Sequence, residues 1–352
     1  MPSTQEFRRR IKSVNNTKQI TKAMQMIASI KMQKAVRTIS AARSYIQNSW
    51  NTLAMLAEIT SPENHPLLQA RPVKKVGLIL ITSDRGLCGS YNTNILNKAL
   101  AFARGDIKLG VTVAPNVISS EHKRVERSYE ISPPRRGESR NDTLNIDLVA
   151  VGQKAAGYAK KIKNGTMVAE FTGLGREIQF EETTPITKLA IDSYISGEFD
   201  QVVVIYSHFE SALKQTPVVK QVLPITKEHI DMPELWESDV KDRREPNHRI
   251  GSRDDENGVI ASEAKQSIEF KFEPNPDAVL EGILSQFIRM QVYGAILEAN
   301  ASEHSARMFA MQNATDNATD LIDELQLIYN SVRQGNITRE IAEISGAAEA
   351  MK

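Results

Sequence analysis

The feature that most constrains the fold of this chain is its last stretch, residues 277–352, which contains no proline. Apolar or small side chains recur there every three or four positions, the period of an α-helix with a narrow apolar stripe. The stripe consists of Leu280, Ile283, Phe287, Met290, Leu297, Ala301, Met308, Met311, Ala314, Leu321, Leu325, Ile328 and Val332. At about 1.5 Å per residue, a helix of this length spans roughly 110 Å. Because so long a helix is not stable alone in water, we expect a partner along most of its length.

A second long helix is predicted at the other end of the chain, where residues 6–61 contain neither proline nor glycine and Pro62 follows. Side chains on one face are spaced alternately by four and three positions, which is a heptad repeat. This seam consists of Phe7, Ile11, Val14, Lys18, Thr21, Gln25, Ala28, Met32, Ala35, Ile39, Ala42, Ile46, Ser49, Leu53 and Leu56. The helix is mostly basic and the C-terminal one leans acidic, and complementary charges select partners in coiled coils. We therefore expect the two helices to pair, with the C-terminal helix extending past its partner beyond Leu325.

Between the two helices the sequence is typical of an α/β domain. Short apolar runs that favour buried strands occur at 76–81, 146–151, 199–206 and 217–223, and helical segments at 92–104, 153–163 and 189–196. Strands that alternate with helices indicate a layered α/β fold with a largely parallel sheet. The predicted fold class is therefore α/β. A long coiled coil formed by residues 1–62 and 274–352 carries an inserted Rossmann-like α/β domain at 63–273.

Two polar segments, about 114–143 and 241–267, do not fit this layer because they are nearly devoid of apolar runs. They are rich in Arg, Ser, Asn and Glu. We expect them to be surface loops or disordered insertions.

The best candidate for a site is the glycine-containing turn after the first strand, which includes Asp84, Arg85, Gly86, Cys88 and Gly89. Such a turn between strand and helix can hold a phosphate, so an α/β enzyme or nucleotide binder is one alternative. No complete phosphate-binding motif is present, however, and a tight turn that serves packing or a partner surface is the other. Cys88 is the single cysteine, and the six histidines form no paired motif with metal-ligand spacing. We expect no metal and no cofactor.

Composition and charge argue against several classes of protein. The net charge is +1, no apolar run is long enough to cross a membrane, and the first residues lack a signal peptide. A single cysteine favours a reducing compartment. The basic N-terminal helix could bind nucleic acid, but no aromatic platform or nucleic-acid motif accompanies it, so we expect no nucleic-acid partner.

Three segments resemble, in order, the signatures of the gamma subunit of F-type ATP synthases. The first is 20–28 with Lys31 and Met32 following, the second is the turn 83–89, and the third is 301–308 continuing through 310–317. The tail, residues 324–344, is also similar to that family. The two polar segments depart from the family pattern as extra insertions.

The resemblance implies a non-catalytic rotor rather than an enzyme. In that family the terminal helices form an antiparallel, left-handed coiled coil inside a ring of alternating alpha and beta subunits. The α/β domain contacts the epsilon subunit and the membrane ring of c subunits. Ion flow turns the shaft, and the shaft drives the catalytic beta subunits through ATP synthesis from ADP. The expected location is the cytoplasmic side of a bacterial plasma membrane, as a peripheral protein. By motif match, the expected contacts with the ring are Lys22, Met24, Arg307, Gln334, Thr338 and Glu340.

Overall fold

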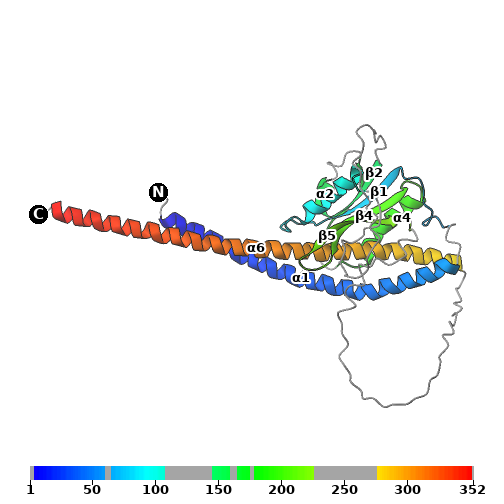
Figure 1. The fold of residues 1–352 in the computed structure, drawn as a ribbon, viewed down its shortest axis with the longest axis horizontal. Helices are drawn as coiled ribbons and strands as arrows, with labels where there is room; N and C mark the ends of the chain where they lie inside the picture. The colour runs from blue at the N-terminus through cyan, green and yellow to red at the C-terminus, as the bar shows by residue number, and fades with distance from the viewer. Residues whose placement is uncertain are drawn as a thin grey trace, which may run out of the picture.

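The computed structural model describes residues 4–59, 65–107, 145–158, 165–174, 178–225 and 276–350, with the side chains of 43–59, 276–278 and 348–350 left out of the description. The polar segments predicted at 114–143 and 241–267 lie outside the described residues. The molecule is an elongated helical pair with an α/β domain beside one end (Figure 1).

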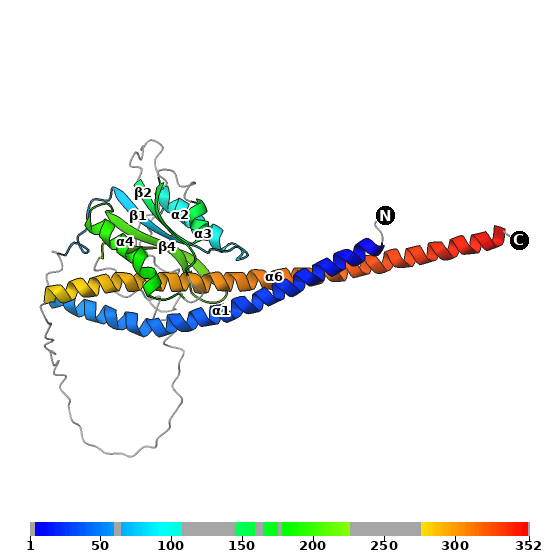
Figure 2. The same cartoon turned by 180° about the vertical axis from the view of Figure 1, so that it is seen from behind.

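The two terminal helices are continuous and lie side by side in antiparallel orientation (Figures 1 and 2). Helix α1 runs over Thr4–Ile59 and helix α6 over Pro276–Ala350. Their contact is the most extensive between any two elements of the described fold. Halfway along, the hydroxyls of Thr21 and Thr315 are 2.8 Å apart and hydrogen-bonded in the buried interface. The prediction of two long paired helices is confirmed.

The heptad seam predicted on α1 is also confirmed. Every seam position with a described side chain, from Phe7 to Ala42, is buried or half-buried. Phe7, Ala28 and Ile39 are buried most completely by apolar contact. Small and polar side chains at the middle of the seam let the two backbones approach closely enough for the threonine hydroxyls to bond.

The single narrow stripe predicted for α6 is wrong in two places. Over 280–302, side chains outside the stripe are also fully buried, among them Leu284, Ile288 and Val292. This half of the helix is covered on one side by α1 and on another by the sheet. Further on, Leu321 and Ile328 were placed on the seam but are 44% and 38% exposed. The contact positions there are Met311, Thr315 and Ala318, which are buried, and Ile322, Leu325 and Tyr329, which are half-buried, so the contact face has rotated by about one residue.

The α/β domain is built on a five-stranded sheet with the order β3-β2-β1-β4-β5. The strands are β1 Lys75–Ile81, β2 Asn145–Val151, β3 Gly165–Phe171, β4 Gln201–Phe209 and β5 Gln215–Leu223. The first four are parallel, and β5 pairs antiparallel with β4 at one edge. The predicted α/β layer is therefore confirmed. Strand β3 was not predicted, because at the opposite edge most of its side chains are exposed and it lacks an apolar run.

Alternating side chains of the strands enter two separate cores, as a pleated strand requires. On one face Val76, Leu78 and Leu80 pack under α2 (Tyr91–Ala103) and α3 (Gln153–Tyr158). On the other face Ile79 and Ile81 pack with α4 (Thr184–Ile195), which follows a 3₁₀ turn at Glu181–Thr183, and with the first half of α6. Helix α6 thus belongs both to the helical pair and to the core of the domain.

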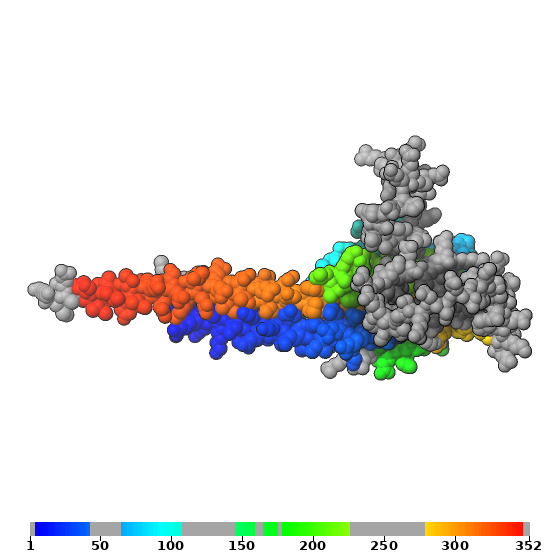
Figure 3. Space-filling model, turned by 60° about the horizontal axis from the view of Figure 1, so that its bottom comes forward, coloured from blue at the N-terminus to red at the C-terminus, as the bar shows by residue number. Residues whose placement is uncertain are grey.

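Beyond the end of α1, helix α6 continues alone. Tyr329 still contacts α1, since Arg8 Nε donates to its hydroxyl at 2.9 Å, so the pair extends a turn past the predicted limit at Leu325. From residue 333 to 347 every side chain is exposed. The space-filling view shows this tip extending past the blue N-terminal helix (Figure 3).

We expect the packing of α6 against both α1 and the sheet to make a large contribution to the free energy of unfolding. Leu284→Ala should lower the free energy of unfolding of the full chain by about 2–5 kcal/mol, since Leu284 is fully buried and the site cannot collapse between helix and sheet. Leu327→Ala is the matched control on the same helix, because Leu327 is 73% exposed, and should change it by less than about 0.5 kcal/mol. Urea unfolding followed by circular dichroism measures both. Equal losses in the two variants would contradict the packing described here.

Candidate functional site

The turn predicted as a site, residues 83–89, connects β1 to α2 and is held by its own polar groups. The Ser83 hydroxyl is 2.7 Å from the Arg85 carbonyl oxygen and 3.0 Å from Asn92 Oδ1. Leu87 and Gly89 adopt positive φ angles of 65° and 57°. Glycine has no steric penalty there, whereas a leucine is strained, so the tight turn itself explains Gly89. Gly86 has no atom within 4 Å of an added Cβ, so no close packing requires it.

Cys88 is enclosed within this turn. It is 2% exposed, and its sulfur accepts a hydrogen bond from Asn92 Nδ2 at 3.2 Å. A reactive cysteine needs access and an activating neighbour. The enclosed position favours the structural role for Cys88 over a nucleophilic one.

The carboxyl ends of the parallel strands, where open α/β sheets bind ligands, are filled by the chain itself. Asp84 accepts hydrogen bonds from the backbone N–H groups of Gln153 and Gly173, at 2.9 and 3.1 Å. The Thr82 hydroxyl accepts from the N–H of Ala155 at 2.8 Å. The N–H groups of Gln153 and Ala155 are ones that a phosphate at the start of α3 would need. The geometry therefore does not favour the nucleotide-binding alternative at this edge.

Helix α6 closes the same edge from outside. The Tyr91 hydroxyl donates to the Ala299 carbonyl oxygen at 3.0 Å. The cavity that remains between Tyr91, Asp84, Glu303 and the strand ends has a volume of about 60 Å³, which is room for a few water molecules rather than a nucleotide. Among the residues that the structure describes, no group of three or more His, Cys, Asp or Glu could hold a metal ion.

Arg307 connects the turn to α6. Its guanidinium donates to the carbonyl oxygens of Gly86 and Arg85 at 3.3 and 3.4 Å, and it forms an ion pair with Glu303 at 2.7 Å. Its side chain is only 12% exposed. Burial raises the pKa of Glu303, and the nearby Arg307 and Lys31 charges act against that rise. Residues from all three signature segments thus meet here: Lys31 on α1, the turn, and the start of 301–308 on α6.

The other predicted contact residues are not brought together. Lys22 is exposed and Met24 half-buried near the middle of α1, whereas Gln334, Thr338 and Glu340 are exposed on the lone tip of α6. Sequence reasoning missed an exposed apolar row on α1, formed by Ile20, Ile27 and Ile30, which are 60%, 55% and 67% exposed. Their spacing of seven and three is a second heptad register, and that pattern could have revealed them.

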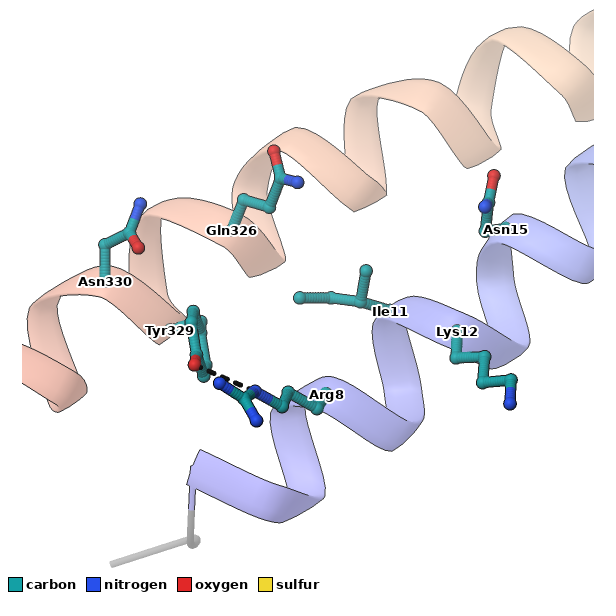
Figure 4. A pocket seen from close by; sticks show the side chains of 7 residues that line it. All are labelled: Arg8, Ile11, Lys12, Asn15, Gln326, Tyr329 and Asn330. Atoms are coloured by element: carbon teal, nitrogen blue, oxygen red, sulfur yellow. Dashed lines mark hydrogen bonds between the residues drawn. The ribbon is translucent and has the colours of Figure 1, made fainter.

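An open groove of about 490 Å³ lies between the helices near the N-terminal end of α1 (Figure 4). Arg8, Ile11, Lys12 and Asn15 line it from α1, and Gln326, Tyr329 and Asn330 from α6. The Arg8 guanidinium also lies 5.5 Å from the centre of the Tyr329 ring, a cation–π contact. This double contact ties the first turns of α1 to α6.

Taken together, the fold and the site define a class: a structural subunit that presents a two-helix shaft to other chains. Its α/β domain has no open ligand edge among the described residues, and the unaccompanied tip of α6 needs a surface from elsewhere. No helix among the described residues is both long and apolar enough to span a membrane.

Comparison with known proteins identifies the family within this class. The model of the ATP synthase family ("ATP-synt") matches residues 3–351. The chain is 35% identical over its whole length to the ATP synthase gamma chain of Heliobacterium modesticaldum and 36% identical to that of Nitrosomonas europaea, with each relative fully covered. A chain from the Euglena gracilis mitochondrial ATP synthase structure has a similar fold, with a TM-score of 0.55 and 18% identity, over 99% of this chain and 94% of that one. The chain belongs to the family of ATP synthase gamma chains.

The charge environment around Arg307 gives a pH prediction. The pKa of His304 is lowered to about 4, first by burial and then by the charges of Arg307 and Lys31. The unfolded chain binds this proton near pH 6.5 and the folded chain only near pH 4. Stability that is present above pH 6.5 should therefore be lost as the pH falls to 4, by on the order of 3 kcal/mol. Urea unfolding at a series of pH values measures this loss. In His304→Gln, the part of the loss that His304 causes should be absent.

His208 provides a control because its pKa is shifted in the opposite direction. Burial acts to lower its pKa, but the hydrogen bond and charge of Glu298 outweigh burial and raise it above the usual value. Its contribution to stability is therefore present at low pH and lost as the pH rises through the raised pKa. His208→Gln should therefore remove a loss of stability that sets in above pH 6.5, and it should leave in place the loss below pH 6.5 that His304→Gln removes. The same pH slope in both variants and the parent chain would refute the assignment.

Proposed function

We propose that the chain is the central-stalk rotor subunit of an F-type ATP synthase. In this role it couples ion flow through a membrane ring to the conformational cycle of the catalytic beta subunits, and it performs no chemistry itself. One observation carries the proposal: an antiparallel helical pair, fixed to an α/β domain at one end, continues at the other as a single exposed helix (Figures 1 and 3). Two further solved structures have a similar fold, with TM-scores of 0.50 and 0.53 and identities of 20% and 16%. They are described as the central stalk and c-ring of the Tetrahymena thermophila mitochondrial ATP synthase and the rotor of the Euglena gracilis mitochondrial ATP synthase.

The surface chemistry of the pair fits rotation inside a ring. The apolar seam lies between α1 and α6, so the outer surface presents mixed polar and apolar side chains. An evenly mixed surface avoids one deep binding minimum, which would stall rotation. The partners are the alpha and beta subunits around the shaft, with the epsilon subunit and the c-ring at the α/β domain. Residues 1–62 and 274–352 form the shaft in this proposal, and 63–273 form the domain with its two polar insertions.

Within this proposal, Lys22, Met24, Gln334, Thr338 and Glu340 contact the alpha and beta subunits. Four of the five are exposed, and Met24 is half-buried. The exposed row of Ile20, Ile27 and Ile30 supplies apolar area on another face of the same part of α1. Arg307 is mostly enclosed, so its contact with the ring is made by the turn residues 85–87 that it positions.

The proposed location is the cytoplasmic side of a bacterial plasma membrane. The curated relatives are bacterial gamma chains, and the complex of this family is membrane-associated. The chain is attached there through its partners as a peripheral protein.

Co-expression with the alpha and beta subunits of the same organism tests the function. We expect the affinity-tagged chain to purify with both subunits and the complex to hydrolyse ATP, because the exposed tip of α6 needs the ring to cover it. Failure of the intact chain to assemble would refute the proposal. Tight binding of ATP by the isolated chain, abolished by Gly86→Ala or Gly89→Ala, would instead support the enzyme alternative.

The proposed ring contacts can be tested within the assembled complex. Lys22→Ala should lower the rate of ATP hydrolysis several-fold, by about 1 kcal/mol of lost interaction energy, since Lys22 projects from the shaft where the ring encloses it. Lys188→Ala on α4 is the matched control, because Lys188 is also exposed but lies on the domain. We expect no change there. Equal rates in both variants would remove Lys22 from the contact surface.

A further inference from the structure

Helix α6 changes the character of its contact with the domain along its length. Over its first turns it packs on the sheet through fully buried apolar side chains such as Leu284, Ile288 and Val292. From residue 298 onward a polar row replaces them, formed by Glu298, Ser302 and Ser305, all at least nine-tenths buried. Their spacing of four and three puts all three on one face of the helix.

Each member of this row makes a directed hydrogen bond to β4 or to the β4–β5 hairpin. Glu298 Oε2 lies 2.6 Å from His208 Nδ1. The Ser302 hydroxyl donates to the Ser207 carbonyl oxygen at 3.0 Å. The Ser305 hydroxyl donates to the carbonyl oxygen of Ala212 and accepts from Gln215 Nε2, the latter at 3.1 Å. Buried polar groups are costly unless they are bonded in this way, so these contacts are specific to one placement of the helix.

A second set of polar contacts holds another face of the same turns. The Ala299 carbonyl oxygen accepts from Tyr91, and Arg307 donates to the carbonyl oxygens of the turn at 85–86. At about 100° per residue, Ala299 lies about a quarter turn, and Arg307 about half a turn, around the helix from the row of Glu298, Ser302 and Ser305. Helix α1 covers a third face, at Leu297 and Ala301. Rotation of α6 about its own axis would therefore break hydrogen bonds on two faces at once.

The polar and apolar sections of α6 differ in how strongly they resist rotation of the helix. Apolar contact is non-directional, so its energy changes gradually as a helix turns. Hydrogen bonds weaken steeply when their geometry is distorted. We propose that Glu298, Ser302 and Ser305 form a rotational lock, the polar joint through which torque on the α/β domain passes into the shaft. This inference rests on the proposed rotor function and assigns these residues a positioning role.

The test uses the complete ATP synthase reconstituted in lipid vesicles. The variant Ser302→Ala/Ser305→Ala removes two hydroxyl donors and leaves the apolar packing of α6 in place. The control Val292→Ala truncates a fully buried side chain of the same helix on the same sheet. For each complex we compare the rate of ATP hydrolysis with the rate of ATP-driven ion pumping. Urea unfolding of each chain checks that the two variants lose comparable free energy of unfolding.

We expect hydrolysis to persist in both variants and the ratio of pumping to hydrolysis to fall roughly tenfold in the serine variant alone, because two directed contacts of the joint are lost. A ratio that is unchanged, or that falls equally in Val292→Ala, overturns the lock. If the double variant does not assemble, Ser302→Ala is measured with the same two outcomes. Failure of the unmodified chain to assemble would instead contradict the rotor function itself.

Discussion

The pairing of α1 with α6 is the constraint on which the rest of the structure depends. A single long helix is not stable alone in water, and α1 and α6 bury their seams against each other. The antiparallel arrangement points both termini toward the same end of the pair and leaves the α/β domain as an insertion beside it. Because α6 is also part of the core of that domain, the shaft and the domain share one packed unit rather than meeting at a hinge.

The α/β domain shows how a fold associated with ligand binding can serve a mechanical role. The edge at which such sheets bind ligands is filled by Asp84, Thr82 and Tyr91 and covered by α6. The backbone N–H groups that could hold a phosphate are bonded within the chain. Tyr91 also bonds to Ala299 of α6, and Arg307 of α6 bonds to the turn at 85–86, so this edge becomes an attachment point of the shaft.

Burial along α6 falls in three stages, and each stage has a physical counterpart in a rotor. The section beside the sheet is covered nearly all round, the middle section is covered by α1 alone, and the tip beyond residue 333 is exposed. The polar contacts of Glu298, Ser302, Ser305 and Arg307 lie where the first stage passes into the second. The parts that need partner subunits are thus separated along the axis from the parts that hold the chain together.

The sequence by itself determined the elements with strong periodicity: the two long helices, the seam from Phe7 to Ala42 and the buried strands β1, β2 and β4. These follow from local spacing of apolar side chains, which depends only on near neighbours along the chain. Three signature segments also placed the chain in its family. Strand β3 and the exposure of Leu321 and Ile328 could not be obtained in this way. An edge strand has little apolar signal, and the rotation of a seam depends on its partner.

Only the tertiary structure decided how the signature segments act on one another. The sequence marked 83–89 as a turn and Arg307 as a contact residue, but it did not show that the guanidinium bonds to that turn, 221 residues away. It also did not show that Glu298, Ser302 and Ser305 face the β4–β5 hairpin. Such contacts join residues distant in the chain, and their partners are largely backbone carbonyl groups, which every residue carries. No sequence pattern therefore specifies these contacts. They form only when the helix packs across the sheet.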